Sequence, residues 1–111
     1  MVPTPFHYRF VSVLPREADE PILRGALRSL LKVTAMTPFG PERVSVREDA
    51  WDAIQMIAES HIGIHGHGRA AEANVWSCKP FDPQEAAEAL DKTLGGVWYY
   101  RRVSHEGYEE P

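Results

Sequence analysis

The sequence contains a single cysteine, no long apolar run and no excess of basic residues. One cysteine cannot form an internal disulfide, so a disulfide-stapled secreted domain is excluded and a reducing, cytoplasmic compartment is expected. No segment approaches the roughly 20 apolar residues of a spanning helix, and the amino terminus lacks a signal-peptide pattern, so no membrane partner is expected. Twelve lysines and arginines against sixteen aspartates and glutamates give a net charge of −4, which argues against a nucleic-acid partner.

Length and composition are typical of one small folded domain over residues 1–111. With 43% hydrophobic and 25% charged residues, the chain has enough apolar surface to offset the entropy of ordering it, which argues against a disordered or fibrous protein. A domain of this size has difficulty enclosing a whole small-molecule site. We therefore expect an enzyme of this length to be an oligomer.

The hydrophobic pattern predicts two helices among several strands. The helices are expected over residues 21–31 and, after Asp82 as N-cap, over residues 83–94. Strands are expected over residues 6–14, 43–47, 52–59 continuing through 60–65, 73–78 and 97–103. Gly66 and Gly68 predict a turn. This order favours an α+β two-layer sandwich, an antiparallel sheet with both helices on one face.

The densest group of reactive side chains lies between Glu59 and His65, with Cys78 on the next predicted strand. One interpretation is structural: Ser60 is an ordinary strand hydroxyl and Cys78 a small buried hydrophobe.

A metal site is a second interpretation of the same segment. Strand alternation would project three imidazoles from one face, where they could bind zinc. These are His61, His65 and His67. The two neighbouring glycines leave the continuation of the strand to His67 open.

A third interpretation rests on a resemblance. The resemblance lies in three features, which are the segment from Glu59 to His65, a cysteine thirteen residues beyond it at Cys78, and the helix start at Asp82-Pro83. In these features the sequence resembles the prokaryotic short-chain S-adenosylmethionine decarboxylases, a pyruvoyl enzyme family. In that family the segment reads Glu-Ser-His-(Ile or Leu)-x-Ile-His. The resemblance covers residues 52–95 in detail and the N-terminal half only in the order of its elements.

Several features depart from the family pattern, among them a shorter interval to the cysteine and the absence of the Gly-x-His opening of the first strand, where this chain has only His7. After the second histidine the family usually continues Thr-Trp-Pro-Glu, whereas this chain continues Gly66-His67-Gly68-Arg69. The usual Cys-Gly is here Cys78-Lys79. The sequence assigns no role to His67 or Arg69.

The chemistry of such residues can be followed directly. The Ser60 hydroxyl can attack the carbonyl of Glu59 and convert the amide to an ester, and elimination and hydrolysis then leave a pyruvoyl group in place of the serine. The chain would be split into a β chain of residues 1–59 and an α chain of residues 60–111, and no external cofactor would be needed. A pyruvoyl carbonyl forms a Schiff base with a substrate amine and takes up the electrons released with carbon dioxide.

The resemblance implies roles for further residues. It implies that His65 removes the serine α-proton during self-processing and that Cys78 donates a proton during decarboxylation, roles that suit an imidazole and a thiol. Strand alternation projects Trp76 to the same side as Cys78, which makes it a candidate wall for the substrate. His61 is also a candidate substrate-binding residue, with no firmer role than positioning.

The resemblance also implies a homodimer in which two sheets pack and each active site borrows residues from its partner. The run of residues 97–100, Val-Trp-Tyr-Tyr, supports this indirectly, because a strand with two apolar faces needs cover on both.

The expected reaction is decarboxylation of S-adenosylmethionine for polyamine (spermidine) biosynthesis. A sulfonium nucleoside calls for aromatic faces, for which the candidates are Trp51, Trp76 and Trp98. The alternative substrates arginine and ornithine call for a carboxylate, for which the candidates are Asp52, Glu48 and Glu72. A non-catalytic ligand-binding α+β domain is the second alternative.

Overall fold

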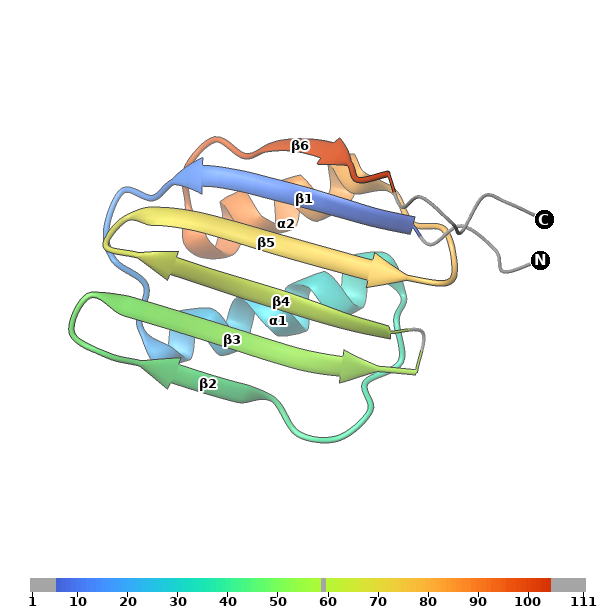
Figure 1. The fold of residues 1–111 in the computed structure, drawn as a ribbon, viewed down its shortest axis with the longest axis horizontal. Coiled ribbons are helices and arrows are strands. Elements are labelled where there is room, and N and C mark those ends of the chain that lie inside the picture. The colour runs from blue at the N-terminus through green and yellow to red at the C-terminus, as the bar shows by residue number, and fades with distance from the viewer. Residues whose placement is uncertain (1–5, 59, 105–111) are drawn as a thin grey trace.

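The computed structural model describes residues 6–58 and 60–104. In chain order the elements are β1 (Phe6–Val13), α1 (Glu20–Thr34), β2 (Arg43–Val46), β3 (Ala50–Ile57), β4 (Ser60–His67), β5 (Ala70–Ser77), α2 (Pro83–Leu94) and β6 (Tyr99–Arg102). The strands form one antiparallel sheet in the order β2-β3-β4-β5-β1-β6. Both helices lie behind this sheet in Figure 1, which confirms the predicted α+β architecture.

Both helices begin and end as their sequences require. The Asp19 carboxylate caps α1 by accepting a hydrogen bond from a first-turn N–H at 3.0 Å, and the helix ends where Ala35 adopts a left-handed φ of 55°. Asp82 caps α2 through the N–H of Gln84 at 2.9 Å, with proline at the next position. The predicted start of this helix is confirmed.

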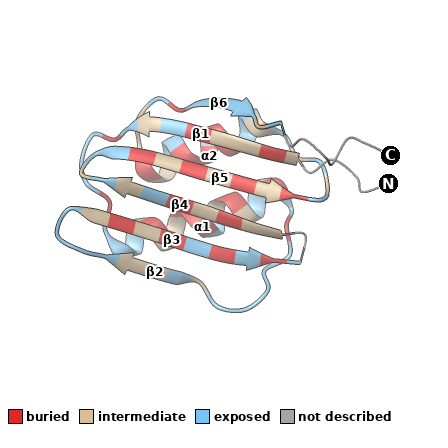
Figure 2. Cartoon of the chain, in the orientation of Figure 1, coloured by how far each residue is buried: buried red, intermediate tan, exposed pale blue. Residues whose placement is uncertain are grey.

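The core lies between the sheet and the helices. Burial alternates along the strands, so one set of side chains points to the helices and the other to the opposite face, which we call the open face (Figure 2). The largest fully buried apolar side chains are Phe10, Leu14, Leu23, Leu27, Leu30, Ile62, Ile64, Val75 and Leu90. None of the helices in the described segments is long and apolar enough to cross a membrane.

The segment 52–65, expected to run as a continuous strand, is two strands joined by a tight turn. β3 ends at Ile57 and β4 begins at Ser60, and these two residues are register partners. Only Ala58 and Glu59 stand between the two strands in the sequence, so none of the usual turn residues marks this hairpin. Glu59 lies outside the described residues.

The turn predicted at Gly66 and Gly68 is confirmed at Gly68 but wrong at Gly66, because β4 continues to His67. Gly66 pairs with Trp51 of β3, and a Cβ at Gly66 would overlap the Trp51 ring. Glycine is therefore needed at this position for close packing. The chain turns instead at Gly68, which has a φ of 59°, and β5 accordingly begins at Ala70, earlier than expected.

The two halves of the chain on either side of the β3–β4 turn interleave. The first half supplies β1, β2 and β3, and the second supplies β4, β5 and β6. β1 of the first half lies between β5 and β6 of the second, and β3 of the first half pairs with β4 of the second, so strands of both halves are neighbours at three places in the sheet. Helix α1 of the first half also packs on α2 of the second.

Candidate active site

The strand register arranges the side chains of the open face in transverse rows, three of which lie at the candidate site. The end row, nearest Ser60, contains Met56, His61, Trp76 and His7. The middle row contains Ile54, Gly63, Asn74 and Arg9. The far row contains Asp52, His65, Glu72 and Val11. Successive rows are about 6.6 Å apart, since they are two residues apart along each strand.

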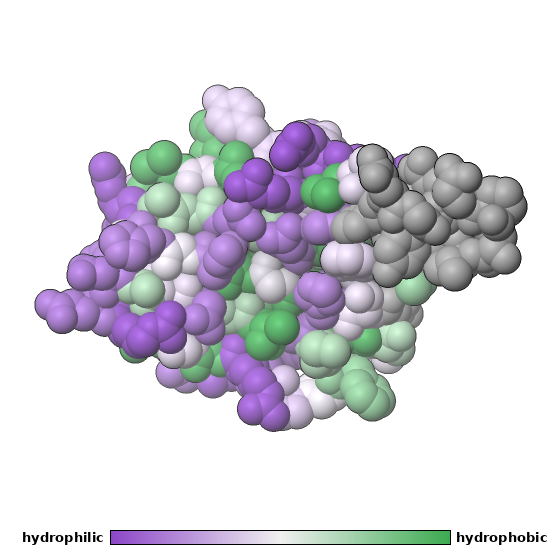
Figure 3. All heavy atoms as spheres, viewed as in Figure 1, coloured by the Kyte–Doolittle hydropathy of each residue, from purple (hydrophilic) through white to green (hydrophobic). Residues whose placement is uncertain are grey.

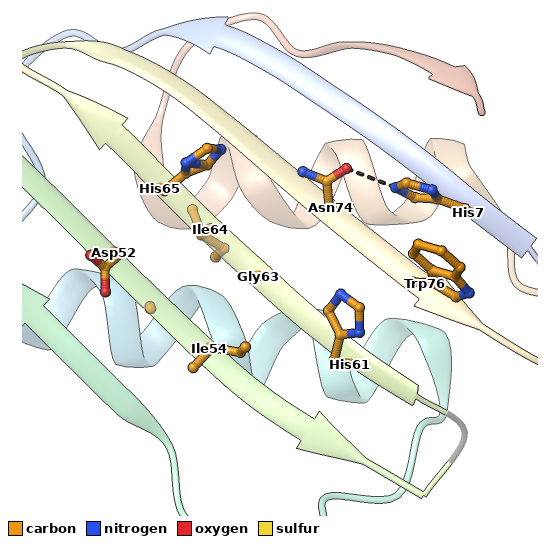
Figure 4. A pocket seen from close by; sticks show the side chains of 10 residues that line it. His7, Asp52, Ile54, His61, Gly63, Ile64, His65, Asn74 and Trp76 are labelled. Atoms are coloured by element: carbon orange, nitrogen blue, oxygen red, sulfur yellow. Dashed lines mark hydrogen bonds between the residues drawn. The ribbon is translucent and has the colours of Figure 1, made fainter.

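A hollow of about 490 Å³ lies over these rows. Its lining includes His7, Asp52, Ile54, His61, Gly63, His65, Asn74 and Trp76, whose side chains stand on the sheet in Figure 4. Gly63 is the reason for the hollow at its centre, because a Cβ added there would meet no atom within 4 Å. The predicted substrate-binding residues Trp76, His61 and Asp52 all line this hollow.

Stacked rings form the end row. The His7 and Trp76 rings lie 4.7 Å apart at 16°, and the His61 ring centroid lies 5.9 Å from that of Trp76. His61 Nδ1 in turn lies 3.3 Å from Ser60 Oγ, so Ser60 adjoins the aromatic end of the hollow. The positioning role expected of His61 is consistent with this contact.

Ser60 and Cys78 lie at the same end of the sheet. Ser60 is the first residue of β4 and is half-buried, and its register partner on β5 is Ser77, the residue before Cys78. Cys78 is exposed. The interpretation of this cysteine as a buried hydrophobe is therefore wrong.

Ser60 and His65 do not lie together within one protomer. They occupy opposite ends of the same strand, and five residues of extended chain separate them by about 16 Å. His65 belongs to the far row, where its Nε2 lies 3.1 Å from Glu72 Oε2. Any action of His65 on Ser60 has to join residues of two protomers.

Glu72 is the centre of a polar network on the open face. Arg9 donates to Glu72 Oε1 through Nη2 at 2.7 Å and Nε at 2.8 Å, and Asn74 Nδ2 donates to Oε2 at 2.9 Å. Partial burial by itself raises the pKa of Glu72, but the hydrogen bonds from Arg9 and Asn74 and the charges of Arg9 and His65 outweigh it. The pKa of Glu72 is therefore below its ordinary value, and its side chain is a carboxylate at neutral pH.

Two candidate groups for the substrate are wrong because they belong to the core. Trp51 and Trp98 are only 2% and 7% exposed, so neither offers a ring face to a ligand. Two of the candidate carboxylates are already paired, Asp52 with Arg47 at 3.0 Å and Glu72 with Arg9. The expected apolar run at residues 97–100 is also divided, since Trp98 is buried while Tyr99 is 70% exposed.

The structure does not support the histidine metal site. His61 and His65 share a face of β4 but lie about 13 Å apart along it. Within residues 6–58 and 60–104, no group of three or more histidine, cysteine, aspartate or glutamate side chains could hold a metal ion.

Sequence reasoning missed the contribution of β1 to the site. His7 bonds Asn74 at 2.8 Å and stacks on Trp76, and Arg9 anchors Glu72. Because side chains alternate between the two faces of a strand, His7 and Arg9 of β1 lie on the same face. The pairing of β1 with β5, distant in sequence, is what brings them to the hollow.

Comparison with known families adds the remaining evidence. Residues 15–105, most of the chain, match the model of the S-adenosylmethionine decarboxylase family, and the match includes Ser60, His65 and Cys78. The chain belongs to this family. A comparison with curated proteins gave no significant match.

Membership in the S-adenosylmethionine decarboxylase family supports a general function. The family is one of decarboxylases, it acts on a small molecule linked to polyamine synthesis, and in general terms it depends on a pyruvoyl group. The open face, with its hollow and its serine at the β3–β4 hairpin, is the candidate active site of this family member.

Proposed function

We propose that this chain is a self-processing, pyruvoyl-dependent S-adenosylmethionine decarboxylase that works as a homodimer. The observation that carries the proposal is the position of Ser60. This serine heads β4 at the hairpin, next to the aromatic end row and across from the residue that precedes an exposed cysteine.

Self-processing converts Ser60 with atoms of the chain and one water. Its Oγ attacks the carbonyl carbon of Glu59, so that a C–O bond replaces the C–N bond and the serine amine is released from the amide. Removal of the Ser60 α-proton then expels the Glu59 carboxylate and leaves a double bond to the former Cβ. Water finally displaces the nitrogen as ammonia, which leaves a ketone at position 60.

His65 of the partner subunit removes the α-proton in this proposal, because the His65 of the same protomer is about 16 Å away. In the proposed dimer the open faces of two protomers pack against each other, related by a two-fold axis that runs along the middle row. This symmetry sets the far row of one protomer, which contains His65, over the end row of the other, next to Ser60. Figure 3 views this face and shows hydrophobic patches among polar side chains. Its exposed apolar side chains include Val11, Val13, Ile54 and Met56, which need cover.

The cleaved product remains one folded unit in this proposal. The bond between residues 59 and 60 lies in a connection between two paired strands, and cleavage there removes no strand pairing. Because β1 of the first fragment lies between β5 and β6 of the second, β3 pairs with β4, and α1 packs on α2, the fragments share one core. They would separate only on unfolding.

A pyruvoyl group at position 60 supplies a carbonyl that condenses with the substrate amine and withdraws electrons as carbon dioxide leaves. The half-buried position of Ser60, beside the hollow, fits such a group. Cys78 returns a proton to carbon from the same end of the sheet. Lys79 occupies the position after it, and its ammonium donates to the Ala35 carbonyl at the end of α1, at 2.7 Å.

S-adenosylmethionine fits the hollow better than a basic amino acid does. The Ser60 end presents stacked rings, which suit an adenine and a sulfonium cation. Asp52, a carboxylate of the lining, lies in the far row, five residues of strand from the level of Ser60, and is already paired with Arg47. The side chain of an arginine or ornithine held at Ser60 is too short to reach this Asp52 within one protomer. The Asp52 of the partner subunit, which the proposed dimer brings over the Ser60 end, is paired with Arg47 in the same way.

A carbon dioxide release assay on the purified protein tests the proposed substrate. S-adenosylmethionine, arginine, ornithine and lysine are offered separately to the same preparation. We expect release from S-adenosylmethionine alone. Release from arginine or ornithine instead would retain the processing chemistry but overturn the assignment of the substrate.

A further inference from the structure

The hydrogen-bond network of the far and middle rows fixes where its protons lie. Ionised Glu72 can only accept hydrogen bonds, so the contact of 3.1 Å with His65 requires a hydrogen on His65 Nε2. By the same reasoning, the contact of 2.9 Å with Asn74 requires the Asn74 amide nitrogen to point at Glu72. The two contacts share the oxygen Oε2, while Arg9 occupies Oε1.

The orientation of Asn74 extends this constraint to the first strand. With its nitrogen toward Glu72, Asn74 presents Oδ1 to His7 Nε2 at 2.8 Å. His7 must therefore donate from Nε2, and its ring is held flat on Trp76 beside Ser60. One carboxylate thus orders side chains in all three rows.

We propose that Glu72 is a positioning residue that holds neutral His65 as the Nε2–H tautomer, with bare Nδ1 as the base. The inference rests on the proposed function, since it assigns a partner to the histidine that removes the serine α-proton. The arrangement is the one in which a carboxylate orients a general-base imidazole and stabilises the imidazolium that forms. Arg9 and Asn74 in turn fix both oxygens of the carboxylate.

Other charged groups around His65 do not replace Glu72. On β3 its register partner is Asp52, whose carboxylate is paired with Arg47 of the β2–β3 connection. On its own strand, His67 lies two residues away on the same face. Of the side chains described around this ring, Glu72 is the one with a hydrogen bond to it.

Nitrogen-15 NMR of the imidazoles in a Ser60→Ala background tests the inference without any cleavage. At a pH where the rings are neutral, about pH 8.5, we expect His65 and His7 both to show the Nε2–H signature. Adding Glu72→Gln should shift His65 toward a mixture of tautomers. Glu42→Gln serves as the matched control, because Glu42 is also paired with arginines but lies away from the open face, and it should leave His65 unchanged.

Cleavage kinetics in the chain that keeps Ser60 supply the second measurement. Glu72→Gln should slow self-cleavage by about tenfold or more, while Glu42→Gln should cleave like the parent. An Nδ1–H tautomer for His65 in the parent, or a tautomer that Glu72→Gln leaves unchanged, would overturn the inference. A parent chain that never cleaves would overturn the proposed function instead, and the tautomer measurement would still decide the role of Glu72.

Discussion

Ser60 at the start of β4 is paired across the sheet with Ser77 at the end of β5. The pairing sets Cys78 one residue beyond the strand, at the end of the sheet where the chain is proposed to open. Ser60 and Ser77, seventeen positions apart in sequence, thus meet through strand register. The proposed electrophile and the proposed proton donor lie at one end of the sheet for this reason.

Replacing the cysteine should separate the two reactions. Cys78→Ala removes the thiol but none of the groups that act in self-processing, so we expect normal cleavage with carbon dioxide release reduced by about a hundredfold or more. Fragment formation is followed by mass spectrometry, and turnover by the release assay. Full decarboxylation by Cys78→Ala would contradict its assignment as proton donor.

A complementation experiment tests the shared active site. Neither Ser60→Ala nor His65→Ala should cleave alone, but a dimer of the two pairs an intact Ser60 with an intact His65 of the partner subunit. Co-expression of the two variants should therefore restore cleavage of the chains that carry His65→Ala. The double variant co-expressed with His65→Ala is the matched control and should restore none. Cleavage by His65→Ala alone would contradict the role of this histidine.

Two glycines on opposite faces of β4 should respond differently to the same added methyl group. Gly66→Ala forces a Cβ into the Trp51 ring and should cost about 1–3 kcal/mol in the free energy of unfolding. Gly63→Ala meets nothing and should be neutral or stabilising by up to about 1 kcal/mol, while it narrows the hollow. Urea unfolding of both variants measures the difference. Equal losses would contradict the packing described for Trp51.

Acid should weaken the link between α1 and the loop before β2. Burial raises the pKa of Glu42, but hydrogen bonds from Arg28 and Arg24 and their charges outweigh it, so the pKa lies below its ordinary value of 4.5. The ionised form therefore stabilises the fold above the unfolded pKa, and this contribution is lost as the pH falls through the folded value.

Glu42→Gln should accordingly lose about 1 kcal/mol in the free energy of unfolding at pH 7. Its difference from the parent should shrink as the pH is lowered below 4.5, which urea unfolding at pH 7 and at pH 3 would measure. Glu17→Gln, at an exposed site, is the control and should change little at either pH. A difference that persisted undiminished at pH 3 would contradict the account of Glu42.

The sequence predicted those parts of the fold that are encoded locally. Asp82 followed by proline marks the start of α2, and alternation revealed most of the strands. The β3–β4 hairpin was missed because Ala58 and Glu59 carry no turn signal, and the role of Gly66 was missed because it depends on Trp51 across the sheet.

The residues of the candidate site likewise fall into those that the local sequence predicts and those that depend on pairing between distant strands. The residues Ser60, His65 and Cys78 could be nominated from their motif, and Trp76 from alternation. The contributions of His7 and Arg9 depend on the pairing of β1 with β5, which no local pattern reveals. The separation of Ser60 from His65 follows only from the observation that both lie on one extended strand.

Mass spectrometry of the intact purified protein, unfolded before injection, tests the central claim most directly. We predict two fragments of residues 1–59 and 60–111, the second lighter by one ammonia than simple hydrolysis would leave it, and one uncut chain for Ser60→Ala. A folded parent that remained a single chain after long incubation, as a non-catalytic binding domain would, contradicts the account. A second fragment that began with an ordinary serine would contradict it as well.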